Sequence, residues 1–98
     1  IAESRATAKV IGAHTPVSTQ KSYTGHTLGA CGALESVFSL LMLRDRFIAA
    51  NRNLDAIDPR CAPLDYVRGA ARSATIDVIM NNNFAFGGIN TTLVFRRF

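Results

Sequence analysis

Two short segments of this chain of 98 residues contain the residue types that acyl-transfer and enolate chemistry use. One runs from Lys21 to His26, and the other, from Asn83 to Asn90, holds two phenylalanines and two adjacent glycines. A histidine can donate or accept a proton near neutral pH, and a glycine-rich loop can move and present backbone amides. Together the two segments predict half of an active site.

His26 follows Gly25 at the start of a helix that we expect to be buried. A helix N-terminus and burial both disfavour the charged imidazolium, so we expect a neutral ring. A neutral imidazole can donate a hydrogen bond to a developing oxyanion, which suits the stabilisation of an enolate. A single histidine near a helix start is more often a cap, and that simpler interpretation stays open.

Glu35 lies in the second and third turns of the same helix, among apolar residues. A buried carboxylate is costly unless a cation and hydrogen bonds compensate it. Lys21, five residues before His26, is the nearest candidate cation in the motif. We therefore expect Lys21 and Glu35 to be linked, directly or through water, although such pairs are usually structural.

The segment after Met80 combines bulky side chains with backbone freedom. Its aromatic residues could plug a cavity, and its amides could point into one. A gate and an oxyanion donor are both compatible with this composition, although a Gly-Gly turn is usually only a turn. The candidate gating residues are Phe84, Ala85, Phe86, Gly87, Gly88 and Ile89.

The elements that must position these residues follow from hydrophobic periodicity and turn signals. Helical spacing followed by Gly12 predicts a first helix, and β-branched residues flanking the aromatic loop predict two strands joined across it. The order helix, strand, helix, strand, strand indicates an α/β layered fold. The predicted segments are a helix over 1–11, a strand over 17–19, a helix over 27–44, an irregular connection over 49–63, and strands over 75–80 and 91–95.

The helix over 27–44 carries apolar residues on nearly every face, so we expect it to be buried on all sides. A chain of 98 residues has little material with which to surround such a helix. The chain also begins at Ile1, already in helical register. We therefore expect it to be one piece of a longer protein and not to fold alone.

Composition excludes several classes of function. Hydrophobic residues make up 48% of the chain, which is typical of a globular protein. The net charge of +4 comes from scattered arginines and forms no basic stripe, so nucleic-acid binding is not expected. The apolar stretch 37–43 is too short to span a bilayer. Cys31 and Cys61 lack metal-ligand spacing and follow no signal peptide, which favours free thiols in a reducing, cytoplasmic setting.

The chain resembles the β-ketoacyl-(acyl carrier protein) synthases at these same residues. Their lysine–histidine motif resembles the run KSYTGHTLGACGALE at 21–35, and their glycine-rich gating loop resembles FAFGGIN at 84–90. The segments 39–43, 47–49 and 91–95 bring it closer to the synthase I and II group of elongating enzymes. The resemblance implies the C-terminal part of a thiolase-like α/β/α fold, with residues 1–98 forming a partial domain.

The resemblance also implies roles for individual residues. His26 matches the second active-site histidine, Lys21 the essential lysine, and Glu35 the buried glutamate that accompanies it. Phe86 matches the gating phenylalanine whose backbone N–H helps to form the oxyanion hole. The family's nucleophilic cysteine and first histidine, in a His-Gly-Thr motif, would lie upstream of Ile1, because neither cysteine of this chain matches the nucleophile's setting.

The implied activity is decarboxylative Claisen condensation of malonyl-acyl carrier protein with an acyl-enzyme thioester. The implied partners are an acyl carrier protein, which brings its own phosphopantetheine, the rest of the synthase, and a second subunit in a homodimer or heterodimer. No other cofactor and no metal are implied. Ala85 and Ile89 replace the family's usual glycine and threonine, which implies a stiffer loop and a more apolar cavity wall. An inactive chain-length partner subunit and a stand-alone protein-binding module are the alternatives.

Overall fold

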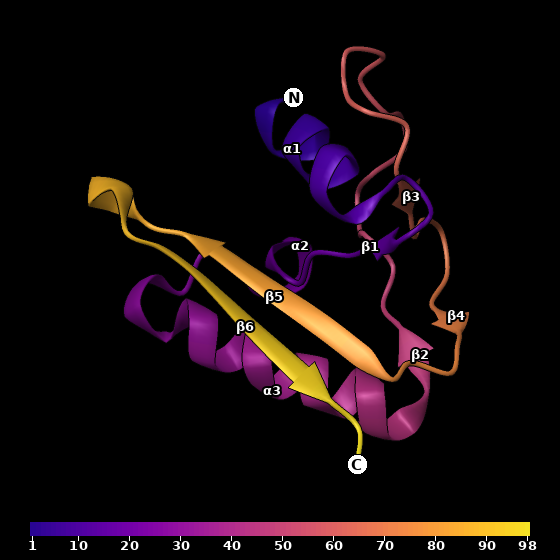
Figure 1. Cartoon of the computed structure of the whole chain (residues 1–98), viewed down its shortest axis with the longest axis vertical. Helices are drawn as coiled ribbons and strands as arrows, with labels where there is room; N and C mark the ends of the chain where they lie inside the picture. The colour runs from indigo at the N-terminus through magenta and orange to yellow at the C-terminus, as the bar shows by residue number, and fades with distance from the viewer.

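The computed structural model describes all residues from 1 to 98. Figure 1 shows a long β-hairpin lying across the longest helix, with the first helix and the short strand pairs to one side of it. The elements are α1 (Ala2–Ile11), β1 (Pro16–Val17), α2 (Lys21–Thr24), α3 (Cys31–Asp45), β2 (Phe47–Ile48), β3 (Asp65–Tyr66), β4 (Arg72–Ser73), β5 (Val78–Phe84) and β6 (Asn90–Arg96). Single 3-10 turns lie at Leu28–Ala30 and Phe86–Gly88.

The first helix and the hairpin confirm two of the predicted segments. Helix α1 ends at Gly12, whose φ of 93° lies in a region that glycine adopts without a steric penalty. Strands β5 and β6 are antiparallel, and their last pair joins Phe84 to Asn90. Strand β5 therefore continues through the three asparagines that we assigned to the loop, because each of them pairs with β6. The connecting loop shortens to residues 85–89.

Two other strand pairs are too short to be visible in the sequence. Strand β1 pairs in parallel with β3, and β2 pairs with β4 in antiparallel fashion. Each of these strands has two residues, so no alternation of polar and apolar residues can develop. The predicted strand over 17–19 is β1, displaced by one residue to Pro16–Val17. The pairs matter because β1 leads directly into α2, which carries Lys21.

The prediction that the third helix is buried on all sides is wrong for this chain. One face of α3 packs against the hairpin and α2, and its buried residues are Cys31, Glu35, Ser39, Met42 and Leu43. On the opposite face Val37 is 52% exposed and Leu40 is 49% exposed. The 98 residues form a single layer against this helix, which leaves its other side uncovered. No helix of the chain is both long and apolar enough to cross a membrane.

A buried asparagine in the irregular connection fixes the position of the segment before Lys21. The Asn51 side chain donates to the carbonyl oxygens of Val17 and Val67, at 2.8 and 3.0 Å, and its Oδ1 accepts from the Thr19 N–H at 2.8 Å. It therefore joins the ends of β1 and β3 and satisfies backbone groups that the short strands leave unpaired. The sequence analysis treated residues 49–63 as connection only and did not identify this role.

Replacing Asn51 with leucine should lower the free energy of unfolding by about 2–3 kcal/mol, because three buried backbone groups would lose their partners. The native protein and the variant would be compared by chemical denaturation. Asn53→Gly is the matched control, since Asn53 has a φ of 64° that glycine also adopts and its side chain is exposed. Equal stability of the Asn51 variant and the native protein would contradict this role.

Candidate active site

The turn between α2 and the 3-10 segment places His26 at the mouth of the site. The Gly25 N–H donates to the Lys21 carbonyl at 2.8 Å and ends α2. Gly25 has φ 70° and ψ −171°, a combination that is essentially restricted to glycine. A side chain at this position would change the direction in which the chain leaves α2. The sequence Gly25-His26 is therefore a structural requirement of the turn as well as a chemical motif.

The imidazole of His26 is held in one tautomer by the backbone. The Leu28 N–H donates to Nδ1 of His26 at 2.9 Å. Since a backbone N–H can only donate, Nδ1 is the acceptor and the ring proton lies on Nε2. Leu28 has a φ of 51°, a left-handed conformation that is uncommon for a leucine. The surroundings thus hold this turn in a conformation that its residues disfavour, and the result is a neutral ring with a free N–H donor.

The expectation that His26 is buried is wrong for this chain, because the side chain is exposed. The helix does not start at Thr27 as we predicted. Residues 28–30 form a 3-10 turn, and α3 begins only at Cys31. The histidine therefore sits ahead of the helix, where few residues of the chain cover it. The neutral ring depends on the hydrogen bond from Leu28 and not on desolvation.

Lys21 and Glu35 form a direct ion pair between Nζ and Oε1, which confirms the expected link. The thiol of Cys31 donates to the same Oε1 at 3.4 Å. Cys31 and Glu35 are four residues apart in α3, so they share the face that meets α2. The Glu35 side chain is only 11% exposed, and that of Lys21 is 41% exposed. The lysine closes the pair from the side of the cavity.

The charge of Lys21 is maintained by this pair. Burial acts to lower the pKa of Lys21, but the hydrogen bond and the negative charge of Glu35, with contributions from Cys31, raise it above its ordinary value. The ammonium form is therefore favoured near neutral pH. A fixed positive charge next to His26 can stabilise negative charge that develops on a bound molecule.

The hairpin loop brings Phe86 to the histidine. The rings of Phe86 and His26 lie nearly parallel, with planes 2° apart and centroids 5.9 Å apart. The loop is closed by a hydrogen bond from the Ala85 N–H to the Ile89 carbonyl at 2.9 Å. Gly87 and Gly88 have φ values of 82° and 80°, so the loop needs glycine at both positions. The Phe86 N–H makes no hydrogen bond within the chain.

One cavity of about 250 Å³ joins the two motifs. Among the predicted site residues, Lys21, His26, Phe84 and Ala85 line it. Glu35 lies behind Lys21, and Phe86 stacks on His26 at the rim. Gly87, Gly88 and Ile89 form the loop tip and do not line the cavity. The full lining is Lys21, His26, Leu28, Gly29, Cys31, Gly32, Asn83, Phe84, Ala85 and Thr91.

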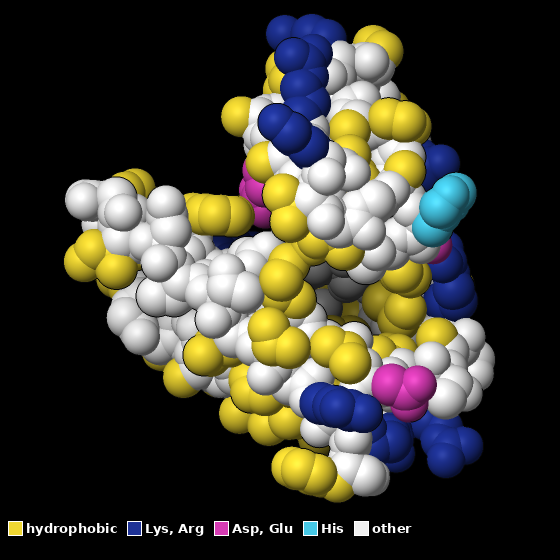
Figure 2. Space-filling model, in the orientation of Figure 1, with side chains coloured by type: hydrophobic (Ala, Val, Ile, Leu, Met, Phe, Trp, Pro, Cys, Tyr) yellow, Lys and Arg dark blue, Asp and Glu magenta, His cyan; other side chains and the backbone are white.

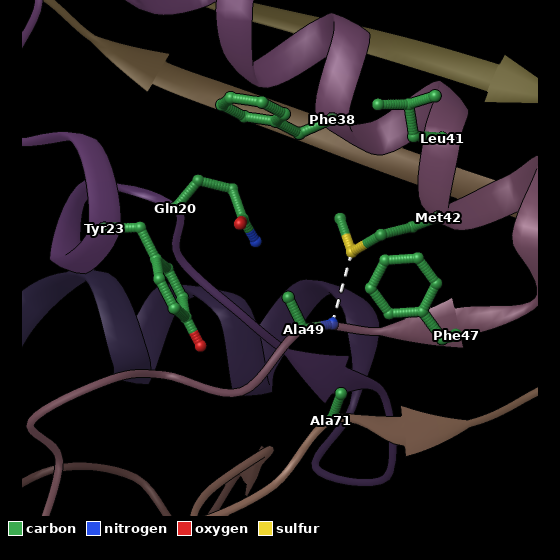
Figure 3. Close-up of a pocket in the computed structure, with 8 residues that line it drawn as sticks. All are labelled: Gln20, Tyr23, Phe38, Leu41, Met42, Phe47, Ala49 and Ala71. Carbon is green, nitrogen blue, oxygen red and sulfur yellow. Dashed lines mark hydrogen bonds between the residues drawn. The ribbon is translucent and has the colours of Figure 1, made fainter.

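A second cavity of about 290 Å³, which the sequence analysis did not identify, lies on the other side of α2. Figure 3 shows Met42 inside it, with Sδ accepting a hydrogen bond from the Ala49 N–H at 3.3 Å. Figure 2 shows apolar side chains around a hollow in the middle of the molecule. The helical spacing of three residues in α3 was the available signal. The lining residues are Gln20, Tyr23, Phe38, Leu41, Met42, Phe47, Ala49 and Ala71.

The residues present do not form a metal centre, because no three His, Cys, Asp or Glu side chains lie together in residues 1–98. Cys31 is buried, as we expected for a helix-packing residue, but its thiol also reaches the Lys21–Glu35 pair. The site thus contains a neutral imidazole N–H, an ammonium group and a mobile aromatic loop. These groups suit the stabilisation of an oxyanion and not a metal-assisted reaction.

Comparison with known proteins agrees with this chemistry. Residues 1–55 match the C-terminal domain of β-ketoacyl synthases. The chain belongs to the β-ketoacyl synthase family. It is 48% identical over 98 residues to 3-oxoacyl-[acyl-carrier-protein] synthase 2 of Coxiella burnetii, covering 97% of this chain and 23% of that protein. It is 40% identical to 3-oxoacyl-[acyl-carrier-protein] synthase 1 of Escherichia coli K12, covering 99% and 24%.

Solved structures give the same result and confirm the expected thiolase-like α/β fold. A β-ketoacyl synthase from Burkholderia phymatum superposes with a TM-score of 0.96 and 55% identity, over 100% of this chain and 24% of that one. The ishigamide ketosynthase/chain length factor superposes with a TM-score of 0.90 and 35% identity, over 98% and 24%. The chain therefore spans about a quarter of the length of these relatives.

Proposed function

We propose that this chain supplies the decarboxylation half of a condensing enzyme that joins malonyl-acyl carrier protein to an acyl-enzyme thioester. The carrying observation is the fixed tautomer of His26, whose Nε2–H is free at the cavity beside the Lys21 ammonium. An N–H donor and a nearby cation are what an enolate oxygen requires. Membership of the β-ketoacyl synthase family supports the same reaction class.

In the proposed reaction the carbon–carbon bond to the malonyl carboxylate breaks and carbon dioxide leaves. The bond's electron pair forms the enolate of the thioester, and His26 donates its Nε2–H to the enolate oxygen. The α-carbon then attacks the acyl carbon, and the enzyme thiolate leaves. Lys21, held by Glu35, keeps positive potential near the developing charge.

Phe86 would act in acyl transfer. Its unpaired backbone N–H can donate to the oxyanion of the acyl thioester, and its ring covers His26 until the loop moves. Neither cysteine of this chain is a suitable nucleophile. Cys31 is buried and bonded to Glu35, and Cys61 lies away from the cavity. We therefore propose that the thiol and a further histidine come from residues outside these 98.

The proposed partners are an acyl carrier protein, the remainder of the synthase and a second subunit. The phosphopantetheine arm would arrive on the carrier protein, and no bound cofactor is proposed. We place the enzyme in the cytoplasm, where malonyl thioesters and reduced thiols are available. A fatty-acid or a polyketide product is compatible with the same chemistry.

A catalytically inactive chain-length subunit is the second candidate, because the ishigamide ketosynthase/chain length factor has the same fold over 98% of this chain. The intact Lys21, His26 and Glu35 favour the active enzyme, since an inactive subunit does not need them. Mass spectrometry of the native protein after incubation with an acyl thioester separates the two. A single acyl group on a cysteine supports the condensing enzyme, and absence of acylation supports the partner subunit.

A stand-alone binding module is the third candidate, and the isolated chain tests it. A self-sufficient module would unfold cooperatively. The uncovered apolar face of α3 argues against it, and we expect the isolated 98 residues to aggregate or to unfold without cooperativity.

The loop glycines provide a further test. Gly87→Ala should slow acylation of the native protein by about 5- to 20-fold, because a φ of 82° costs an L-residue about 1–2 kcal/mol. Gly87→Asn should lose less, since asparagine tolerates this region better. Stopped-flow acylation would measure both rates. An alanine variant as fast as the asparagine variant would show that the loop conformation is not needed for acylation.

A further inference from the structure

We propose that Asn83 is a substrate-positioning residue that hydrogen-bonds a secondary amide of the carrier-bound thioester. This inference rests on the proposed function. Asn83 lies on β5 and lines the same cavity as Lys21 and His26. Its carboxamide packs on Gly32 of α3, where an added methyl group would come within 3.6 Å of Nδ2. The small residue at 32 gives Asn83 its place at the cavity wall.

A chain of hydrogen bonds connects Asn83 to the backbone of α3. Asn83 Nδ2 donates to Asn81 Oδ1 at 3.4 Å, and Asn81 Nδ2 donates to Ser36 Oγ at 3.4 Å. The Ser36 hydroxyl donates to the Gly32 carbonyl at 2.7 Å. These polar side chains lie on the strand face that meets α3, where apolar residues would ordinarily pack. The sequence analysis named the asparagines but gave them no role.

The carbonyl at the end of this chain fixes the orientation of every member. Because the Gly32 oxygen can only accept, Ser36 must donate to it and accept from Asn81. Asn81 must then use its Nδ2 toward Ser36 and its Oδ1 toward Asn83. Asn83 must in turn use one N–H toward Asn81. Its second N–H and its Oδ1 make no hydrogen bond within the chain, so the cavity receives one donor and one acceptor.

A secondary amide is the group that matches such a pair, since it also offers one N–H and one carbonyl oxygen. A malonyl thioester itself has only acceptor oxygens and would leave the Asn83 oxygen unpaired. The pantetheine arm that carries the thioester contains secondary amides, the nearer one two carbons from the sulfur. Asn83 would therefore position the arm, while His26 acts on the reacting carbonyl.

A cycle of protein and substrate changes tests this role in the native protein. Asn83→Leu keeps the side-chain volume and removes both hydrogen bonds. We expect KM for malonyl-pantetheine to rise about tenfold with kcat nearly unchanged, because the amide contact is the same in the ground and transition states. With the malonyl thioester of ethanethiol, which has no amide, the variant and the native protein should have the same kcat/KM. Asn83→Ser, with a small polar side chain, replaces the leucine variant if the latter does not fold.

The outcomes separate this inference from the proposed function. An equal loss with both thioesters, or no loss with either, would overturn the amide contact while leaving the condensing activity in place. If the native protein turned over neither thioester, the proposed function would fail, and calorimetric binding of pantetheine would decide the role of Asn83. Binding weakened about tenfold by Asn83→Leu would support it, and unchanged binding would overturn it. Thr92→Val, which breaks the Thr92–Asn82 bond on the outer face of the hairpin, is the control.

Discussion

Replacing His26 with alanine in the native protein should lower the rate of malonyl-thioester decarboxylation by about 10²–10³-fold. This is the usual loss when one donor to an oxyanion is removed. The structure gives the reason, because the Leu28 N–H occupies Nδ1 and leaves Nε2–H as the free donor. Since the donor is needed only as negative charge develops, kcat should fall while KM changes little.

Release of carbon dioxide from carboxyl-labelled malonyl-carrier measures this effect. His26→Gln keeps a side-chain N–H and should retain more activity than His26→Ala. His14→Ala is the matched control, since His14 is the other histidine of the chain and its exposed side chain is absent from the lining of the cavity. A His26→Ala variant with native decarboxylation would show that the imidazole does not stabilise the enolate.

Replacing Lys21 with methionine should have the second largest effect, on stability and on activity together. Glu35 would remain in place, 11% exposed and without its cation. Loss of one partner from a fully buried pair costs about 3–5 kcal/mol, but water reaches Lys21, so we expect about 1–2 kcal/mol of unfolding free energy. Decarboxylation should also slow, because the positive potential next to His26 would be lost.

A double-mutant cycle with Glu35→Gln isolates the pair. The two single changes should together cost more than the double change, because Lys21→Met,Glu35→Gln leaves no unpaired carboxylate. Lys9→Met controls for the loss of a lysine, since Lys9 is the other lysine of the chain and is exposed on α1. Additive effects in the cycle would mean that the ion pair contributes nothing to stability.

The pair also predicts a dependence on pH. The pKa of Lys21 is raised in the folded state, so the unfolded chain loses this proton first as pH rises. The stabilisation is therefore complete below the ordinary lysine pKa of 10.5 and is lost as pH rises through the folded value. The stability difference between the native protein and Lys21→Met should be constant near neutral pH and should shrink in strongly alkaline solution. A difference that shrank near pH 7 would contradict this sign.

The Lys21–Glu35 link could be predicted from the sequence because the cost of a buried carboxylate is large and general. The hairpin could be predicted for a similar reason, since β-branched residues on both sides of a Gly-Gly turn have few alternatives. The tautomer of His26 could not be predicted. It depends on the Leu28 turn, whose left-handed conformation opposes the preference of leucine.

The burial predictions for His26 and for the helix over 27–44 were wrong for one physical reason. Apolar composition tells which surfaces require a partner, but it does not tell whether that partner lies within the same 98 residues. Asn51 was missed because its role depends on two strands of two residues each, which leave no pattern in the sequence. The orientation of Asn83 likewise depends on contacts between α3 and β5 that only the structure provides.

The most direct test of the central claim is to follow both products of one reaction. The native protein, acylated with a short acyl thioester, would be mixed with carboxyl-labelled malonyl-carrier. We predict labelled carbon dioxide and a β-ketoacyl-carrier in equal amounts, with His26→Ala forming neither at a comparable rate. If the native protein formed neither product while an active synthase in a parallel vessel consumed the same carrier, the chain would not belong to a condensing enzyme.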